Sequence, residues 1–364
     1  MSRKSISTLR IRNPVAVGTG LVALDVVIDV NTNHSPWLWT GGTCGNVLTI
    51  LSYLGWQAFP IGRLNGDSAS RRVEGDLKRW GVHLDFAKLK PASRTPIVVH
   101  RIAKTSSGIP FHRFSWTCPN CGSWLPGYQP VLASAAKKIV SQFGAPKVFF
   151  LDRVSRGALI LAKACAELGA LIFFEPSGFG EPRLFKEAYA MAHVLKYSHE
   201  RVRSSHGIAN SGPFLEIETL GAEGLRYRSK IKGARSNGWE QLEAYEILDL
   251  KDTAGAGDWC SAGIIHKLAQ KGLNGLLQTR KSQLQEAFRF GQALATWNCS
   301  YEGARGGMYA VDKRTFRRQV QGIMSRNGAK VLKREIPTPT VRKIFERICP
   351  NCTPDPCSKR KTNR

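Results

Sequence analysis

Short apolar runs of β type alternate with segments of helical period along most of this chain. Within residues 42–54, for example, Val47, Ile50 and Leu51 fall on one face of a helix. Strands joined by helices in this way form parallel sheets that are buried on both faces. The alternation therefore predicts an α/β fold with a mainly parallel central sheet, helices on both faces and a small β lid. We expect strands over residues 15–18, 25–30, 147–151, 171–174 and 194–197, and helices over 42–54, 68–80, 155–168, 183–193 and 284–297.

Two regions depart from this alternation. Residues 94–128 contain two β-type runs joined by a Ser/Gly turn, which indicates a hairpin added to the main sheet. We expect the lid to come from about residues 28–40 and 94–117. Beyond Gly307 the alternation fades into a basic, Pro- and Cys-containing segment. We therefore divide the chain into a domain over 13–310 and a basic C-terminal extension over 311–364.

The net charge of the chain is strongly positive. Lys and Arg number 53 against 27 Asp and Glu, a formal net charge of +26, and residues 311–364 alone hold 15 Lys or Arg against 4 Asp or Glu. Such a surplus favours partners that carry phosphate, whether a nucleotide, an anionic sugar or a nucleic acid. A lysine-rich surface that only keeps the chain soluble is the alternative reading.

The sequence contains no targeting or membrane signal that we recognise. No apolar stretch of signal-peptide length follows the basic residues at 3–12, and the longest apolar runs fall far below the ~20 residues of a membrane helix. We expect a cytoplasmic protein with no membrane partner. The odd number of cysteines, 9, also favours a reducing compartment.

Two identical CPNC tetrapeptides stand far apart in the sequence. Cys118 and Cys121 belong to the first, and Cys349 and Cys352 belong to the second. Two such knuckles can together supply four thiolates to a tetrahedral zinc ion, which would tie the basic tail to the predicted hairpin. The alternatives are two unrelated turns or two redox pairs.

The heptapeptide DTAGAGD at residues 252–258 carries the strongest chemical signal. Its small residues Gly255, Ala256 and Gly257 let successive N–H groups point into one concavity, and we expect a helix to begin at Asp258. A carboxylate beside such an anion site can accept a proton from a hydroxyl that attacks phosphorus. An N-cap Asp after a glycine turn is the structural alternative.

DTAGAGD closely resembles the second signature of the ribokinase-like (PfkB) carbohydrate kinase family. A Gly-Gly pair, Gly41 and Gly42, with Asn46 downstream, is similar to the first signature. The resemblance covers roughly residues 13–310. It implies that Gly41, Gly42, Asn46 and an earlier aspartate, Asp25, hold the acceptor, and that Asp258 acts as the general base.

The resemblance also implies a nucleotide site. The turn with Thr219, Gly221 and Gly224 lies between two β-type runs, about thirty residues before the heptapeptide. In the family, the corresponding turn lies against ATP. Residues 284–297 and the turn after them resemble the helix and Gly-Ala turn that flank the adenine.

Metal binding is where the sequence departs from the family. The family often organises Mg²⁺ with an Asn-x-x-Glu motif, and here residues 196–201 keep Glu200 but offer no Asn at the expected offset. Mg²⁺ would still be needed to offset charge on a transferring phosphoryl group. The family also binds a monovalent cation near the residue that corresponds to Asp252, which permits such a site here.

Two other nucleotide-binding patterns do not fit. Residues 18–23 match G-x-G-x-x-G/A, but the run DVVIDV that follows is β-type, whereas a dinucleotide site needs a helix there. No G-x-x-x-x-G-K-[ST] pattern occurs, which excludes a P-loop kinase.

The sequence thus predicts an ATP-dependent kinase that phosphorylates a hydroxyl of a sugar or sugar-like acceptor. Alternatives are a nucleoside kinase of the same fold and a non-catalytic kinase-fold protein that binds nucleic acid through its basic surface. A homodimer formed through the lid is compatible with this reading.

Overall fold

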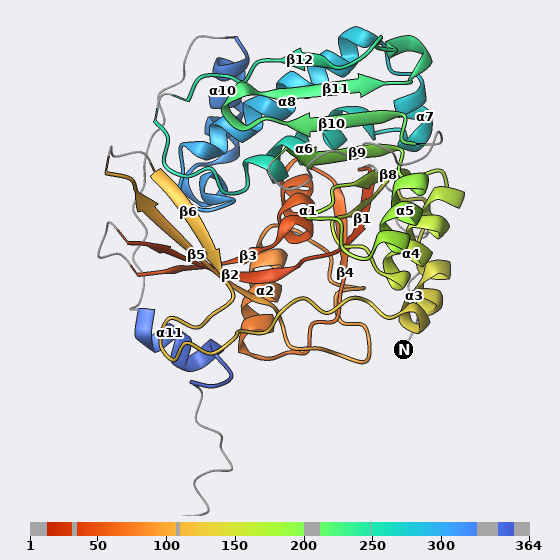
Figure 1. The fold of residues 1–364 in the computed structure, drawn as a ribbon. Helices are drawn as coiled ribbons and strands as arrows, with labels where there is room; N and C mark the ends of the chain where they lie inside the picture. The colour runs from red at the N-terminus through yellow and green to blue at the C-terminus, as the bar shows by residue number, and fades with distance from the viewer. Residues whose placement is uncertain are drawn as a thin grey trace, which may run out of the picture.

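The computed structural model describes residues 13–30, 35–106, 110–199, 212–247, 249–325 and 341–352. An eight-stranded sheet forms the centre of the fold (Figure 1). Its strands run parallel from β4 to β10, and β11 and β12 are antiparallel additions at one edge. In spatial order they are β12 (Glu240–Leu242), β11 (Leu225–Ser229), β10 (Leu215–Thr219), β9 (Val194–Ser198), β8 (Leu171–Phe174), β7 (Val148–Leu151), β1 (Val15–Thr19) and β4 (Gln57–Ile61).

A second, four-stranded sheet projects from one side of the molecule and forms the lid (Figure 1). Its order is β3 (Trp37–Gly41), β2 (Ala23–Asp29), β5 (Ile97–Lys104) and β6 (Pro110–Ser115). The hairpin predicted within residues 94–128 exists as β5 and β6, but its placement on the main sheet was wrong. It pairs instead with β2, because residues 24–29 run parallel to β5.

Helices cover both faces of the main sheet, as predicted. One hydrophobic core cluster packs α3 (Ala133–Ile139), α4 (Arg156–Glu167) and α5 (Pro182–Met191) on one face. The other cluster contains apolar residues of the remaining helices, which are α1 (Thr43–Tyr53), α2 (Ser68–Arg79), α6 (Ala256–Leu268), α7 (Gly272–Leu277), α8 (Lys281–Cys299), α9 (Gly306–Ala310), α10 (Lys313–Met324) and α11 (Val341–Ile348).

The predicted fold class and element order are confirmed. All five predicted helices occur, with ends shifted by at most three residues, because the apolar period marks the buried face better than it marks the caps. The boundary at residue 310 stays a prediction. Immediately after it, α10 packs on α8 and buries Phe316 and Val320 in the main core. Within the described residues, no helix is long and apolar enough to span a membrane.

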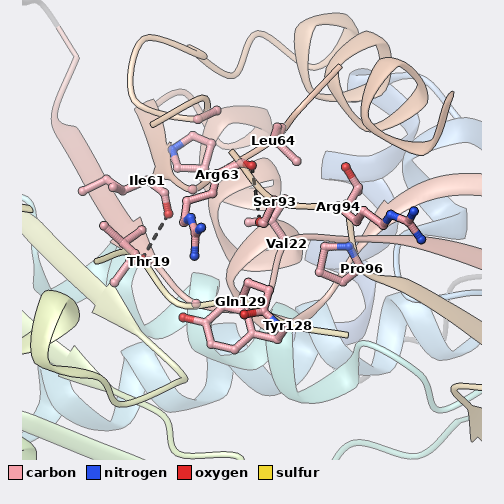
Figure 2. A pocket seen from close by; sticks show the side chains of 16 residues that line it. Thr19, Val22, Ile61, Arg63, Leu64, Ser93, Arg94, Pro96, Tyr128 and Gln129 are labelled. Atoms are coloured by element: carbon pink, nitrogen blue, oxygen red, sulfur yellow. Dashed lines mark hydrogen bonds between the residues drawn. The ribbon is translucent and has the colours of Figure 1, made fainter. Parts of the chain in front are cut away.

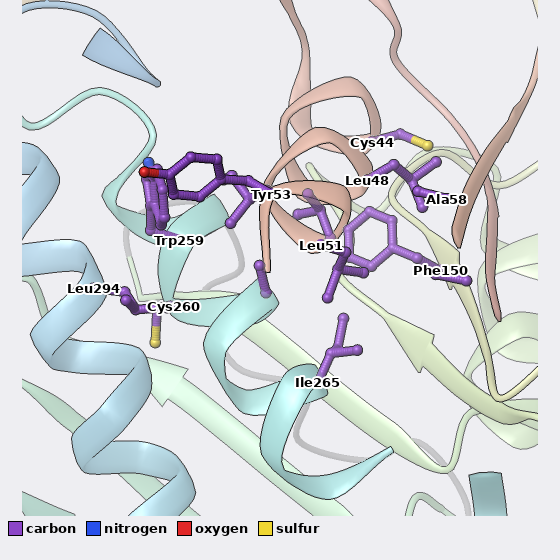
Figure 3. Close-up of a cluster of buried hydrophobic side chains, with 14 of the residues drawn as sticks. Cys44, Leu48, Leu51, Tyr53, Ala58, Phe150, Trp259, Cys260, Ile265 and Leu294 are labelled. Carbon is purple, nitrogen blue, oxygen red and sulfur yellow. The ribbon is translucent and has the colours of Figure 1, made fainter. Parts of the chain in front are cut away.

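Helices α6 and α8 cross at two glycines. A Cβ on Gly291 would lie 2.7 Å from the backbone oxygen of Cys260, and a Cβ on Gly263 would lie 2.7 Å from the Cα of Gly291. Figure 3 shows the side chains around this crossing, with Trp259 and Cys260 on α6 and Leu294 on α8. The crossing matters for function because α6 carries the end of the DTAGAGD heptapeptide.

We predict that Gly291→Ala destabilises the protein by about 1–3 kcal/mol, because the added methyl group must push two packed backbones apart. Gly75→Ala is the matched control, since Gly75 lies in α2 and has nothing within 4 Å of its Cβ position. This control should be neutral or slightly stabilising, as alanine favours a helix. Thermal unfolding of the two variants tests the difference, and equal melting temperatures would contradict it.

Candidate active site

The heptapeptide forms a tight turn that leads into α6 at the carboxyl ends of the parallel strands. Gly255 adopts φ +75°, and a Cβ there would lie 2.3 Å from the oxygen of Ala304, so only glycine fits. Because this residue already caps the helix, α6 begins at Ala256, two residues earlier than predicted. Asp258 therefore lies in the first turn of α6 and is partly exposed. Ala256 N–H donates to Thr253 O (3.2 Å), so Gly255 and Gly257 are the stronger candidates for anion binding.

Asp258 and Asn46, which are 212 residues apart in the sequence, meet in the structure. The Asn46 amide donates to Asp258 Oδ2 at 2.7 Å, and its carbonyl oxygen accepts from Arg305 Nε at 3.0 Å. Arg305 is buried and also donates to Thr40 O (2.5 Å) and to Asp76 Oδ2 (2.8 Å). These contacts fix the orientation of the Asn46 amide, with its donor toward the predicted base.

Asp25 lies on lid strand β2 beside this network. A Cβ on Gly41 would lie 1.8–2.0 Å from the carboxylate atoms of Asp25, so the glycine makes room for that side chain. Burial raises the pKa of Asp25 to about 7; Arg305 opposes this rise and Asp258 adds to it. Burial thus disfavours the ionised form of this carboxyl group, and binding of an acceptor hydroxyl by Asp25 stays a prediction.

The Gly41–Gly42 pair stays a predicted part of the acceptor site, and in the structure it also makes room for this chain's own atoms. The space that a side chain would fill is occupied by Asp25 at Gly41 and by Leu21 at Gly42. For Gly42 (φ +76°), a Cβ would lie 2.4 Å from the oxygen of Leu21. The pair therefore lets β3 enter α1 tightly against Asp25 and Leu21.

Asp252 links the heptapeptide to the lid. Its Oδ1 accepts from Ala254 N–H (3.0 Å) and its Oδ2 from Gly303 N–H (2.9 Å). His100 Nε2 lies 3.3 Å from Oδ2, and His112 Nδ1 lies 3.2 Å from Oδ1. Burial acts to raise the pKa of Asp252, but the contacts with the two histidines outweigh it and hold the pKa well below its usual range. A monovalent cation at Asp252, which stays a prediction, would compete with these histidines.

A buried lysine, Lys196, contacts the backbone of the heptapeptide. Lys196, on β9, donates to Glu175 Oε1 (2.6 Å) and to Gly257 O (3.2 Å). Ser261 of α6 donates to the other oxygen of Glu175 at 2.5 Å. Burial acts to lower the pKa of Lys196, but the attraction of Glu175 outweighs it, so the pKa lies above its ordinary value. An ammonium group is thereby fixed under the predicted phosphoryl site.

A small pocket lies between the carboxyl ends of β1 and β4 and the segments around residues 93–96 and 128–131 (Figure 2). Arg63 lines it, but its guanidinium donates to Pro91 O and Pro130 O. None of the four predicted acceptor residues is among its lining residues. We therefore place the candidate site at Asp258 and Asn46, because hydrogen bonds and charges converge there and not at this pocket.

The predicted nucleotide residues lie where β10 turns back into β11. Thr219 ends β10, Gly221 adopts φ +62° in a 3₁₀ turn over Gly221–Glu223, and Gly224 adopts φ +97°. The Cβ position of Gly221 has nothing within 4 Å, whereas that of Gly224 is closed by Leu242 O at 2.1 Å. Gly221 therefore offers an open backbone surface, and Gly224 closes the hairpin. Nucleotide binding here stays a prediction.

The remaining predicted metal ligands divide into two groups. Glu200 lies outside the described residues. The four cysteines of the CPNC pairs come together, with all four Sγ atoms within 4.8 Å of one another. The dinucleotide fingerprint at residues 18–23 leads into strand β2, as the sequence indicated, and not into a helix.

Four site residues were missed by the sequence analysis: Arg305, His100, His112 and Lys196. Among 53 Lys and Arg residues, nothing in the sequence distinguishes a buried cation from an exposed one. For Lys196 a signal existed, because a lysine in the middle of an apolar strand run needs a buried partner. The sequence contains no signal for the roles of His100 and His112, since their contacts with Asp252 join segments about 140–150 residues apart.

Comparison with known proteins agrees with this geometry. Residues 185–310 match the model of the pfkB family carbohydrate kinases. The chain is 24% identical over 285 residues to the probable chloroplastic fructokinase-6 of Arabidopsis thaliana, an alignment that covers 72% of this chain and 70% of the relative.

Solved structures with similar folds are themselves sugar or nucleoside kinases. Ribokinase from Giardia lamblia aligns with a TM-score of 0.64 and 16% identity, over 87% of this chain and all of that one. The Burkholderia thailandensis nucleoside kinase, solved with inosine, aligns with a TM-score of 0.60 and 15% identity, over 85% of this chain and 98% of that one. At these identities the likeness shows the fold, and the matched segment at residues 185–310 includes the whole heptapeptide. The chain therefore has the fold of the ribokinase-like kinases, and its segment 185–310 matches the pfkB carbohydrate kinase family.

Proposed function

We propose that this chain transfers the γ-phosphoryl group of ATP to a hydroxyl of a sugar or nucleoside, with Asp258 as the general base. The observation that carries this proposal is the hydrogen bond from Asn46 to Asp258 at the first turn of α6. It unites the base, a polar group suited to a polyol and a helix N-terminus suited to phosphate.

In this mechanism Asp258 accepts the proton of the attacking hydroxyl as its oxygen approaches phosphorus. Asn46 and Asp25 orient the acceptor. The N–H groups of Gly255 and Gly257 and the N-terminus of α6 stabilise negative charge on the transferring group, and Lys196 adds a positive charge beneath them. Thr219 and Gly221 are proposed to approach the nucleotide.

ATP would enter with Mg²⁺, which offsets charge on the phosphates. Carboxylates of the kind that Mg²⁺ prefers occur at this edge of the sheet, although the nearest one under the loop, Glu175, is already bound to Lys196 and Ser261. The predicted ligand Glu200 follows β9 in the sequence.

The charge of the site favours an uncharged acceptor. Asp25 and Asp258 raise each other's cost of ionisation, and Arg305, the cation beside them, is bound to Asp76. A phosphate group placed there would lie beside the carboxyl groups of Asp25 and Asp258, and an ionised carboxylate repels it. We therefore propose a neutral sugar or nucleoside; among the similar structures, a nucleoside kinase was solved with inosine and an aminoimidazole riboside kinase with its riboside.

We also propose a compartment for the protein and name two alternative properties. The described residues contain no membrane-spanning helix, and we place the kinase in the cytoplasm. A homodimer formed through the lid and nucleic-acid binding through the basic surface remain alternatives. In a gel-shift titration, affinity for nucleic acid that falls steeply with salt would favour the latter.

We predict that Asp258→Asn lowers turnover by about 10²–10⁴-fold, because the amide cannot accept the hydroxyl proton. ATP affinity should change little, since the loop backbone and the helix N-terminus remain. The assay is ADP release with a panel of neutral sugars, nucleosides and their phosphorylated counterparts. Asp249→Asn is the control, being the same change at a half-exposed position that pairs with Lys251. Unchanged turnover in Asp258→Asn would contradict the assignment of the base.

A second prediction concerns the stability cost of Asp25. Because its pKa is raised from 3.8 to about 7 in the folded protein, the wild type loses stability as the pH rises between those values and not above them. The variant Asp25→Asn has no such loss. The stability of the variant relative to the wild type should therefore rise by about 4 kcal/mol from pH 4 to pH 8.

Urea unfolding at several pH values measures this difference. Asp85→Asn, at an exposed position, is the control and should show no such trend. Acceptor phosphorylation by Asp25→Asn should fall at the same time. A stability difference that is the same at pH 4 and pH 8 would contradict the raised pKa of Asp25.

A third prediction concerns the lid. His112→Ala removes the contacts of β6 with Asp252 and Thr253, so the lid should close less firmly over the loop. We expect kcat/KM for the acceptor to fall by about 10-fold, which corresponds to the loss of one hydrogen bond to a charged group. Lys104→Ala, at an exposed position of β5, is the control. Steady-state kinetics test the pair, and equal values for both variants would refute a role of His112 in closure.

A further inference from the structure

Four cysteine thiols converge where the end of the lid meets the C-terminal helix. Cys118 and Cys121 lie in the turn after strand β6, and Cys349 and Cys352 lie at and after the end of α11. Cys118 Sγ is 3.6 Å from Cys352 Sγ, and Cys121 Sγ is 3.8 Å from Cys349 Sγ. These pairs are 234 and 228 residues apart in the sequence, so the fold itself brings the two CPNC segments together.

The first segment has the form of a metal-binding knuckle. The backbone N–H groups of Asn120 and Cys121 donate to Cys118 Sγ, and Ser123 donates to Cys121 Sγ. Gly122 adopts φ +71°, and its N–H donates to Cys118 O at 2.8 Å. Donors aimed at sulfur stabilise thiolates, and a turn of this shape points both sulfurs to one side.

The spacing of the sulfurs fits a tetrahedral metal. With Zn–S bonds of about 2.3 Å, tetrahedral geometry separates the sulfur atoms by about 3.8 Å. The Cys118–Cys352 and Cys121–Cys349 sulfur separations are 3.6 and 3.8 Å, and all four sulfur atoms lie within 4.8 Å of one another. A disulfide needs sulfurs about 2.05 Å apart, so neither pair is a disulfide at the separations in this structure.

We propose that Cys118, Cys121, Cys349 and Cys352 bind one structural zinc ion. Four thiolates complete the coordination and leave no position for water or substrate, so the ion takes no part in phosphoryl transfer. Its role is to hold α11 in place. This helix has only eight residues and buries Ile344, Phe345 and Ile348 against the main core. So short a helix is marginal alone, and a metal at its end supplies the missing stability.

The ion also bears on the acceptor site through packing. Helix α11 packs on α2, and α2 packs on lid strands β2 and β3. Asp76 of α2 accepts from Arg305, which orients Asn46. A zinc ion at this cluster therefore joins α11 to the turn after β6, and it holds α11 against α2, the helix that supports the acceptor network.

The primary test is metal content. The full-length protein, purified without added metal or chelator, should contain one zinc ion per chain by inductively coupled plasma mass spectrometry. The double variant Cys121→Ser/Cys352→Ser should contain none, and Cys357→Ser, which changes another cysteine of the same tail, should keep it. Iron in place of zinc, or metal-free wild type with these thiols oxidised, would overturn the proposal.

A second measurement uses only the wild-type chain, so it tests the proposal even if the double variant folds poorly. Replacement of zinc by Co²⁺ in the wild-type chain should give the visible absorption of a tetrahedral cobalt–thiolate centre. Removal of the metal by a chelator should increase hydrogen exchange in α11 while the amides of α6 stay protected. A missing cobalt spectrum, or α11 protection that does not depend on metal, would refute a structural zinc. Neither readout depends on kinase activity.

Discussion

The arrangement of the proposed acceptor site depends on the hydrogen bonds made by the buried guanidinium group of Arg305. A buried charge of this kind is tolerated only where partners satisfy it, and Arg305 finds them in three different segments: Thr40 at the end of the lid, Asp76 on α2 and Asn46 on α1. Loss of one partner would leave a buried charge unsatisfied, so these segments are positioned as a unit. The lid, α1 and α2 therefore share one polar anchor, and Asp258 connects to it through Asn46.

The sequence predicted the parts of the site that depend on local chemistry. The turn at Gly255 and the carboxylate at Asp258 could be predicted because small residues followed by an acid have few structural uses. The fold class followed from alternating periods in the same way. Pairing between distant segments was harder to predict from the sequence. The hairpin β5–β6 and a lid shared with residues 28–40 were predicted, but the pairing of β5 with residues 24–29 was not, since a strand's own residues do not identify its partner.

The two glycines at 41 and 42 illustrate a subtler limit. Glycine in a sequence indicates that something lies close to the backbone, and a ligand was the natural expectation. The structure fills both spaces with the protein itself, with Asp25 against Gly41 and Leu21 against Gly42. The effect on function is still direct, because the first glycine is what allows Asp25 to sit beside Arg305 and Asp258. Only coordinates distinguish a glycine that admits a ligand from one that makes room for a side chain of the same protein.

The surplus of positive charge does not come from the active site. Around the heptapeptide and Asn46, the described residues include the carboxylates of Asp25, Asp76, Asp152, Glu175 and Asp258, against the three cations Arg153, Lys196 and Arg305. This inner surface is acidic or neutral, although the whole chain carries +26. Short-range contacts in the site thus suit a neutral acceptor and a metal-bound nucleotide. For the proposed kinase, the excess charge would act at longer range by attracting anionic ATP, an effect that salt weakens.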